Sequence, residues 1–319
     1  MAARMIPALT LIWLGHQALA IPLPEYLSQS YPKDPEYLIA YQELRYQSDL
    51  SNALSTRPDP VRLDQKKQSA LVEQAQAALR QTRATAATEA LANYWQVHQA
   101  QLELELAQAK TEHYDLLAQA AELSFQAGFV SDLELNQARS EAEAAQVELA
   151  QAQKQLSLAK ASYPIETETL PLPPPLPNNL DARRHPEYLQ ARIVYFDALR
   201  AAAEKQGAGY SDLEQAEAQR DLREQEALMR QVEKKRQEDL ADSQAALATN
   251  RQQLELAEIQ IQTAREELAA AQTRLARGAG TRIDLIAAQE AWLEAIIQRE
   301  TLAHTSWQTW LTTLAQGGI

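Results

Sequence analysis

The chain contains two copies of one pattern, and this duplication restricts the folds that it can adopt. The segment 34–38, Asp-Pro-Glu-Tyr-Leu, returns at 185–189 as His-Pro-Glu-Tyr-Leu. Further along, the segment 128–138 returns at 278–288 with glycine, hydroxyl, acidic and apolar residues at matching positions. The members of both pairs are separated by about 150 residues, so we expect two repeats with the same internal plan.

The composition is typical of long helices and coiled coils. The chain is rich in Ala, Gln, Glu and Leu, and it contains only three Phe, eight Gly and no Cys. Its formal net charge of −13 would repel a phosphate backbone, so no nucleic acid is expected as a partner. The absence of cysteine excludes a disulfide framework and a thiolate metal site.

The first residues have the features of a secretory signal. Arg4 precedes an apolar stretch over residues 5–14, and Ala18-Leu19-Ala20 supplies small residues where a signal peptidase cuts. We therefore predict a signal peptide over residues 1–20, with an amphipathic or unstructured terminus as the alternative. No other apolar run reaches the roughly 18 to 20 residues of a membrane-spanning helix, so no direct membrane span is expected.

Proline divides the rest of the chain. Six of the fourteen prolines lie between Pro164 and Pro177, in a stretch that cannot be helical and should be extended. No proline occurs at 61–163 or at 187–319, so both regions are free to form uninterrupted helices. The predicted organisation is a first repeat at 21–163, a Pro-rich linker at 164–180 and a second repeat at 181–319.

Between the breaks, the hydrophobic periodicity is that of a coiled coil. In the second repeat, an apolar residue recurs at every seventh position: Leu240, Leu247, Leu254, Ile261, Leu268 and Leu275. We expect helices over Asp64–Gln126 and Glu214–Ala276, each roughly 95 Å long at 1.5 Å per residue. The predicted fold is all-α, a tandem duplication of long antiparallel coiled-coil helical hairpins.

Each long helix is expected to turn back at a glycine. Gly128 and Gly278 suit the left-handed residue that ends many helices. Ser131 and Glu134 then form the pattern of a capping box, which Thr281 and Asp284 repeat with a shorter acid. The hairpin tips are therefore predicted at 129–132 and 279–282.

In this order and duplication, the motifs resemble the TolC-like outer-membrane efflux family, from about Leu23 to about Leu314. The resemblance implies a homotrimer that forms a helical periplasmic tunnel on an outer-membrane β-barrel. Its hairpin tips would receive a periplasmic adaptor (membrane fusion) protein that connects it to an inner-membrane pump. The chain would then be a passive component of an efflux or type I secretion system. It would be exported to the periplasm or cell envelope, either free there or associated with the outer membrane.

The chain departs from the family where the barrel strands would be inserted. Those positions hold only 55–63 and 206–212, whereas a single spanning strand needs about 9 to 11 residues and a hairpin needs two. We therefore expect a TolC-like tunnel domain with little or no β-barrel. The alternative is a barrel-less structural coiled-coil scaffold in the periplasm or cell envelope.

The resemblance places the residues of adaptor docking or gating at the two tips. They are Gly128, Phe129, Ser131, Asp132, Leu133, Glu134, Gly278, Gly280, Thr281, Arg282, Ile283 and Asp284. Capping alone also explains Ser131 and Glu134. We hypothesise that Arg282 forms an ion pair with an acidic tip residue of a neighbouring hairpin, such as Asp132.

No arrangement of reactive residues indicates an enzyme. The histidines after the predicted signal peptide, His98, His113, His185 and His304, are scattered, and no metalloprotease, phosphate-loop or nucleophile-elbow motif occurs. We therefore expect no catalytic activity, no cofactor and no bound metal. An adaptor-type protein is disfavoured, because no long stretch of alternating β-branched residues could form the β domains of an adaptor.

Overall fold

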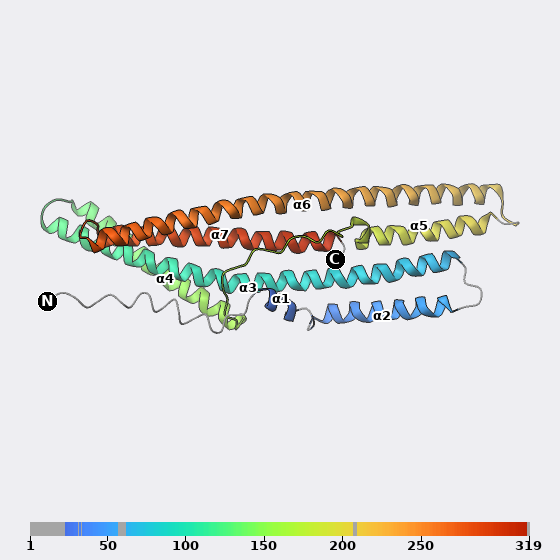
Figure 1. Ribbon diagram of the computed structural model, residues 1–319, viewed down its shortest axis with the longest axis horizontal. Coiled ribbons are helices and arrows are strands. Elements are labelled where there is room, and N and C mark those ends of the chain that lie inside the picture. The colour runs from blue at the N-terminus through green and yellow to red at the C-terminus, as the bar shows by residue number, and fades with distance from the viewer. Residues whose placement is uncertain (1–22, 31, 33, 57–61, 207–208, 318–319) are drawn as a thin grey trace. The chain divides into compact units, whose positions relative to one another are not determined.

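A computed structural model describes residues 23–30, 32, 34–56, 62–206 and 209–317, and these residues form helices and loops without any β-strand. The predicted signal peptide at 1–20 lies outside this range, as do parts of the short segments 55–63 and 206–212. Figure 1 shows the helices in chain order. They are α1 (Leu23–Ser30), α2 (Pro35–Ser55), α3 (Arg62–Gln126), α4 (Asp132–Ser162), the 3-10 helix η2 (Ala182–Arg184), α5 (Pro186–Lys205), α6 (Asp212–Ala276) and α7 (Arg282–Gln316).

The predicted all-α fold is confirmed. The two long helices, α3 and α6, begin two residues before the predicted starts and end at the predicted residues. The repeated Pro-Glu-Tyr-Leu segments begin α2 and α5. In each, proline occupies the first helical turn, and the preceding Asp34 or His185 accepts a hydrogen bond from a backbone N–H of that turn, at 2.8 and 3.2 Å.

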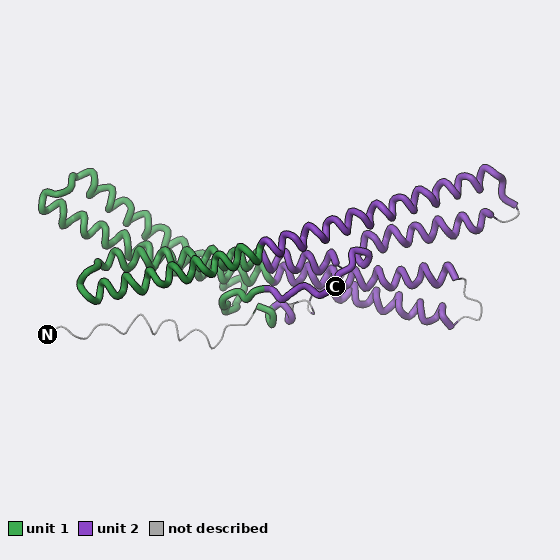
Figure 2. The backbone as a smooth tube through the Cα atoms, turned by 45° about the horizontal axis from the view of Figure 1, so that its top comes forward, with its two compact units in different colours: residues 1–26, 91–172, 250–305 green, residues 27–90, 173–249, 306–319 purple. Residues whose placement is uncertain are grey.

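The chain divides into two compact units, coloured separately in Figure 2. Unit 1 contains residues 1–26, 91–172 and 250–305, which include the start of α1, the second half of α3, all of α4, the end of α6 and most of α7. Unit 2 contains residues 27–90, 173–249 and 306–319. Both hairpin tips belong to unit 1.

In unit 1, helix contacts follow the order α4, α3, α7, α6. Arg139 of α4 forms an ion pair with Glu122 of α3. His113 of α3 lies 2.9 Å from Glu290 of α7. On the other side of α7, Arg299 pairs with Glu258 of α6 at 2.8 Å. Neighbouring helices in this order run antiparallel, and α4 and α6 are its first and last members.

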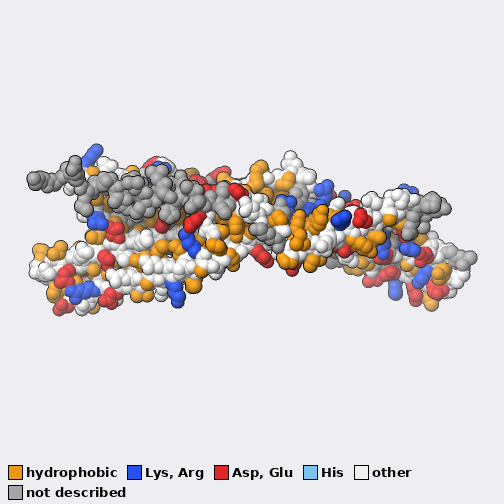
Figure 3. Space-filling view, turned by 90° about the horizontal axis from the view of Figure 1, so that it is seen from below, with side chains coloured by type: hydrophobic (Ala, Val, Ile, Leu, Met, Phe, Trp, Pro, Cys, Tyr) orange, Lys and Arg blue, Asp and Glu red, His pale blue; other side chains and the backbone are white. Residues whose placement is uncertain are grey.

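Small residues allow these helices to approach closely. On α4, the buried positions after Leu135 are Ala142, Ala145, Ala152 and Ala159. On α6, the predicted heptad residue Leu254 is buried, together with Ala257, Ala264 and Ala271. On the face drawn in Figure 3, the hydrophobic side chains that remain visible lie in several separate patches between charged ones.

Unit 2 combines a small core with ion pairs along α3 and α5. Its buried cluster is Ala77, Tyr188 and Leu189, against which Met229 and Val232 of α6 pack. Beside it, Lys67 pairs with Asp197, Glu73 with Arg192 and Asp64 with Arg200, at 2.6 to 2.9 Å. These pairs fix α3 and α5 in antiparallel register.

Candidate functional site at the hairpin tips

Both tips have the same backbone geometry. Gly128 and Gly278 have φ angles of 77° and 71°, in the left-handed region where a side chain would be strained. At the first tip, the N–H groups of Gly128 and Phe129 donate to the carbonyl oxygens of Phe125 and Ser124, both at 2.9 Å. The second tip repeats this pair of bonds, which is a Schellman motif.

The predicted caps follow each turn. Glu134 N donates to Ser131 Oγ at 3.3 Å, and Ser131 N donates to the Glu134 carboxylate at 2.7 Å, so the capping box is confirmed. Thr281 and Asp284 form the same two bonds at 3.1 and 2.9 Å. The hydrogen bonds from the backbone N–H and then from the hydroxyl of Ser131 or Thr281 lower the pKa of Glu134 and Asp284.

The two tips differ in the side chains that they expose. At the first tip, Phe129 is 84% exposed and Leu133 is 77% exposed. At the second, Ala279 replaces the phenylalanine, and Ile283, the counterpart of Leu133, is half-buried. Gly280 is close to the preceding helix, because a Cβ atom there would lie 3.0 Å from the Arg274 Cβ. Only the first tip therefore presents large apolar side chains to solvent.

Arg282 forms an ion pair, but not with the expected residue. Its guanidinium contacts Glu112 of α3 rather than Asp132. The reason is that the second tip contacts α3 at Glu112, which lies more than three helical turns before the end of α3, where the first tip begins. Asp132 instead occupies the first turn of α4, where a negative charge is favourable near the helix N-terminus. Within the chain, Arg282 therefore pairs with Glu112, and its pairing with an acidic tip residue of another hairpin stays a prediction.

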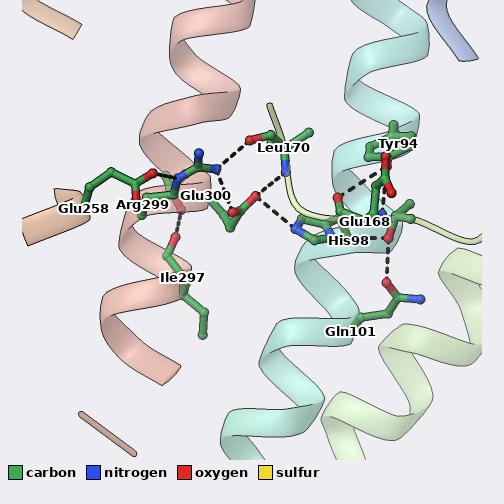
Figure 4. A network of polar contacts seen from close by, with 11 residues as sticks. Tyr94, His98, Gln101, Glu168, Leu170, Glu258, Ile297, Arg299 and Glu300 are labelled. Atoms are coloured by element: carbon green, nitrogen blue, oxygen red, sulfur yellow. Dashed lines mark hydrogen bonds and ion pairs between the residues drawn. The ribbon is translucent and has the colours of Figure 1, made fainter. Parts of the chain in front are cut away.

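A buried ionic network in unit 1 was missed by the sequence analysis (Figure 4). Glu300 is only 1% exposed, and its carboxylate accepts a hydrogen bond from Leu170 N at 2.8 Å and faces His98 Nε2 at 3.1 Å. Arg299 donates to the other Glu300 oxygen at 2.8 Å, to the Leu170 carbonyl at 2.6 Å and to Glu258 at 2.8 Å. The network joins α3, α6 and α7 to the linker.

One sequence signal could have identified this network. Ile286, Leu293, Glu300 and Trp307 recur at every seventh position of α7, and all four are buried. A carboxylate in such an apolar seam must find partners, because burying an unpaired charge is very costly. The periodicity therefore marks Glu300 as a buried ionic residue.

Aromatic residues next to the network are perturbed by burial. Burial raises the pKa of Tyr94 to about 12, and its hydroxyl accepts a hydrogen bond from Glu168 N at 2.8 Å. His304 stacks on Trp95 with 4.8 Å between ring centroids, and burial lowers the pKa of this imidazole to about 4. The described part of the chain contains no group of three or more metal-ligating side chains.

None of the helices that the structure describes combines the length and the hydropathy needed to cross a membrane.

Comparisons with known proteins find a family match over part of the chain and a shared fold over most of it. Residues 61–162 match the outer membrane efflux protein family. Among solved structures, the chain is similar to CusC, which forms a transmembrane channel (TM-score 0.64, 13% identity, 95% of this chain and 97% of CusC). The CmeC outer membrane channel of Campylobacter jejuni is also similar, with a TM-score of 0.61 and 10% identity, over 93% of this chain and 85% of CmeC. The outer membrane protein VceC of Vibrio cholerae is similar with a TM-score of 0.58 and 14% identity, over 92% of this chain and 96% of VceC. No curated protein matches significantly.

At these identities, the similarity to solved structures establishes the fold, and the family match adds sequence similarity over most of the first repeat, residues 61–162. The duplicated glycine motifs described above lie at the turns of that fold. The chain is therefore similar to the TolC-like outer-membrane efflux proteins, in sequence over residues 61–162 and in fold over more than nine-tenths of its length.

Proposed function

We propose that the chain is a TolC-like component of an efflux or type I secretion system. Copies of it, as a homotrimer, enclose a passive α-helical duct in the periplasm, and the hairpin tips dock an adaptor protein that links the duct to an inner-membrane pump. The observation that carries this proposal is a second hydrophobic seam on both α4 and α6.

On α4, the second seam faces away from α3. Its positions recur at steps of four and three; beyond the tip, its large apolar members are Val147 and Leu158, each 57% exposed, and polar residues occupy most of the positions between them. On α6, the second seam faces away from α7 and includes Leu256 and Ile259, which are 61% and 62% exposed. Such spacing is typical of a helix that packs against neighbours on two sides.

The two seams can be aligned through one layer of contacts. Ala159 of α4 packs on Val97 of α3, and the adjacent His98 contacts Glu300 of α7. Arg299, next to Glu300, contacts Glu258 of α6. Leu158 and Ile259 therefore flank the same layer at opposite ends of the helix order. Pairing α4 of one copy with α6 of the next continues the antiparallel alternation.

We propose different roles for the two tips. The first tip, with exposed Phe129 and Leu133, docks the adaptor, while the capping residues Ser131 and Glu134 hold its shape. The second tip acts in gating, because its Arg282 is bound to Glu112 on α3.

The oligomer is tested by cysteine cross-linking, which is clean because the chain has no cysteine of its own. Chains carrying both Leu158→Cys and Ile259→Cys should form dimers and trimers on oxidation, seen on non-reducing gels. The matched control replaces Ile259→Cys with Gln260→Cys, the next residue of α6, which is also exposed but points about 100° around the helix from Ile259. Equal cross-linking in both variants, or in neither, would refute the proposed interface.

Docking and gating have separate tests. Phe129→Ala should weaken binding of a purified adaptor several-fold, whereas Ala279→Ser, at the matching position of the second tip, should leave it unchanged. Arg282→Glu should raise the conductance of the reconstituted duct, and Arg277→Glu is the charge-matched control. Unchanged binding to Phe129→Ala, or unchanged conductance of Arg282→Glu, contradicts the corresponding role.

A structural coiled-coil scaffold is the second candidate, because its helical hairpins would need no closed ring. Native mass spectrometry distinguishes the two functions: a closed trimer supports the duct, and a monomer or dimer supports the scaffold.

A further inference from the structure

The start of the Pro-rich linker is bound to the helices of unit 1 through three consecutive contacts. Thr167 Oγ1 lies 3.2 Å from His98 Nδ1, Glu168 N donates to the Tyr94 hydroxyl, and Leu170 contacts Glu300 and Arg299 through its N–H and carbonyl. We call residues 165–170 the linker strap. Figure 4 shows it running alongside the direct contact between His98 on α3 and Glu300 on α7.

One ring nitrogen of His98 faces a group that only accepts hydrogen bonds. The Glu300 carboxylate receives the Leu170 N–H and the Arg299 guanidinium, and its Oε2 lies 3.1 Å from His98 Nε2. An ionised carboxylate has no proton to donate. His98 Nε2 must therefore carry a hydrogen for this contact to be favourable.

The other nitrogen also faces an acceptor, because the orientation of one amide fixes the hydrogen bonds around it. The Gln101 amide nitrogen is 3.4 Å from the Glu166 carboxylate, and Glu166 is also paired with Lys160. The Gln101 side-chain oxygen then lies 2.6 Å from Thr167 Oγ1 and accepts a hydrogen bond from the Thr167 hydroxyl, which uses the one hydrogen of that hydroxyl. The Thr167 oxygen is left to accept from His98 Nδ1, which must also carry a hydrogen.

We propose that His98 is a buried imidazolium, protonated on both ring nitrogens, that fastens the linker strap to α3 and α7, and that its deprotonation loosens the strap. The charges in contact with it agree. Along Glu258, Arg299, Glu300 and protonated His98, the signs alternate and the net charge is zero.

The remaining titratable groups around His98 come from four elements. Glu166 and Glu168 lie on the linker strap, Tyr94 on α3, Lys160 on α4 and His304 on α7. Tyr94 stays protonated because burial raises its pKa to about 12, and His304 stays neutral because burial lowers its pKa to about 4. Neither therefore changes charge near neutral pH.

The direction of the pH effect follows from the hydrogen bonds. At low pH, both N–H groups hold the strap, and the stabilisation is complete. As the pH rises and one proton leaves, a nitrogen lone pair faces an oxygen of Glu300 or Thr167. Loss of one charge-assisted hydrogen bond should speed opening of the strap about tenfold.

The protonation state is tested by NMR on full-length protein with ¹⁵N-labelled histidine, using His98→Gln to assign the signals. Wild-type His98 at pH 7 should show two protonated ring nitrogens. Thr167→Val removes the acceptor at Nδ1 and should convert His98 to a neutral ring with one protonated nitrogen. An unprotonated nitrogen in the wild-type protein at pH 7, or a Thr167→Val spectrum unchanged from wild type, overturns the proposal.

Hydrogen exchange measures the strap itself. The protection factor of the Leu170 amide should fall about tenfold as the wild-type protein loses the His98 proton, while in His98→Gln it should be low at every pH. His113→Gln, which removes a histidine whose ring contacts Glu290 in the same unit, is the control and should behave as wild type. A wild-type protection factor that is constant with pH, or a pH response kept in His98→Gln, contradicts the role of His98.

Discussion

Replacement of Glu300 tests how strongly the buried network holds unit 1 together. Glu300→Ala removes the acceptor for Leu170 N, His98 and Arg299, all within 3.1 Å, and leaves the His98 ring and the Arg299 guanidinium, each less than 9% exposed, without this partner. Each buried donor without a partner costs about 1 to 3 kcal/mol. Arg299 keeps Glu258 and the Leu170 carbonyl, so we expect a total loss of about 3 to 5 kcal/mol.

The measurement is urea unfolding at fixed protein concentration, followed by circular dichroism, with the stability change taken from the midpoint at constant slope. Glu290→Ala is the control, because it breaks a histidine–glutamate pair of the same type whose side chains are 18% and 15% exposed. It should cost about 1 kcal/mol. The double variant Glu300→Ala/His98→Leu should lose less free energy of unfolding than the sum of the losses of the two single variants. Equal losses for Glu300→Ala and Glu290→Ala would refute the reasoning.

Three further predictions concern the two tips and His304. Gly278→Ala should cost about 1 to 2 kcal/mol from backbone strain alone, measured by urea unfolding, because no atom lies within 4 Å of the added Cβ; a neutral effect would contradict the left-handed turn. Ser131→Ala should cost about 1 kcal/mol and increase amide exchange in the first turn of α4, whereas Ser140→Ala on the same helix should not. His304 has a folded pKa of about 4 against 6.5 unfolded, so its burial destabilises the protein as the pH falls through this window. His304→Gln should remove about 2 to 3 kcal/mol of that acid sensitivity in melting experiments; an unchanged pH profile would exclude this cause.

Much of the fold follows from local sequence rules. The absence of proline predicted α3 and α6, with a heptad pattern in α6, and the glycine and hydroxyl–acid motifs predicted both turns, because these features act within a few residues of chain. The third capping box, Ser211 with Glu214, has the same pattern and could have been predicted from it. The signal peptide, the repeat boundaries and the docking or gating roles of the tip residues stay predictions.

The remaining contacts depend on how distant helices align. Arg282 meets Glu112 rather than Asp132 because the second tip reaches α3 at a level that no local motif encodes. The network of His98, Arg299 and Glu300 joins residues about 200 positions apart. The α7 heptad therefore predicts that Glu300 is buried, but it does not predict which residues contact it.

Electron microscopy of the purified protein tests the proposed duct most directly. If the exposed seams of α4 and α6 pair between copies, averaged end-on views will show a closed three-fold ring of helices around a central pore. Single chains or dimers, with both seams facing solvent, would contradict it.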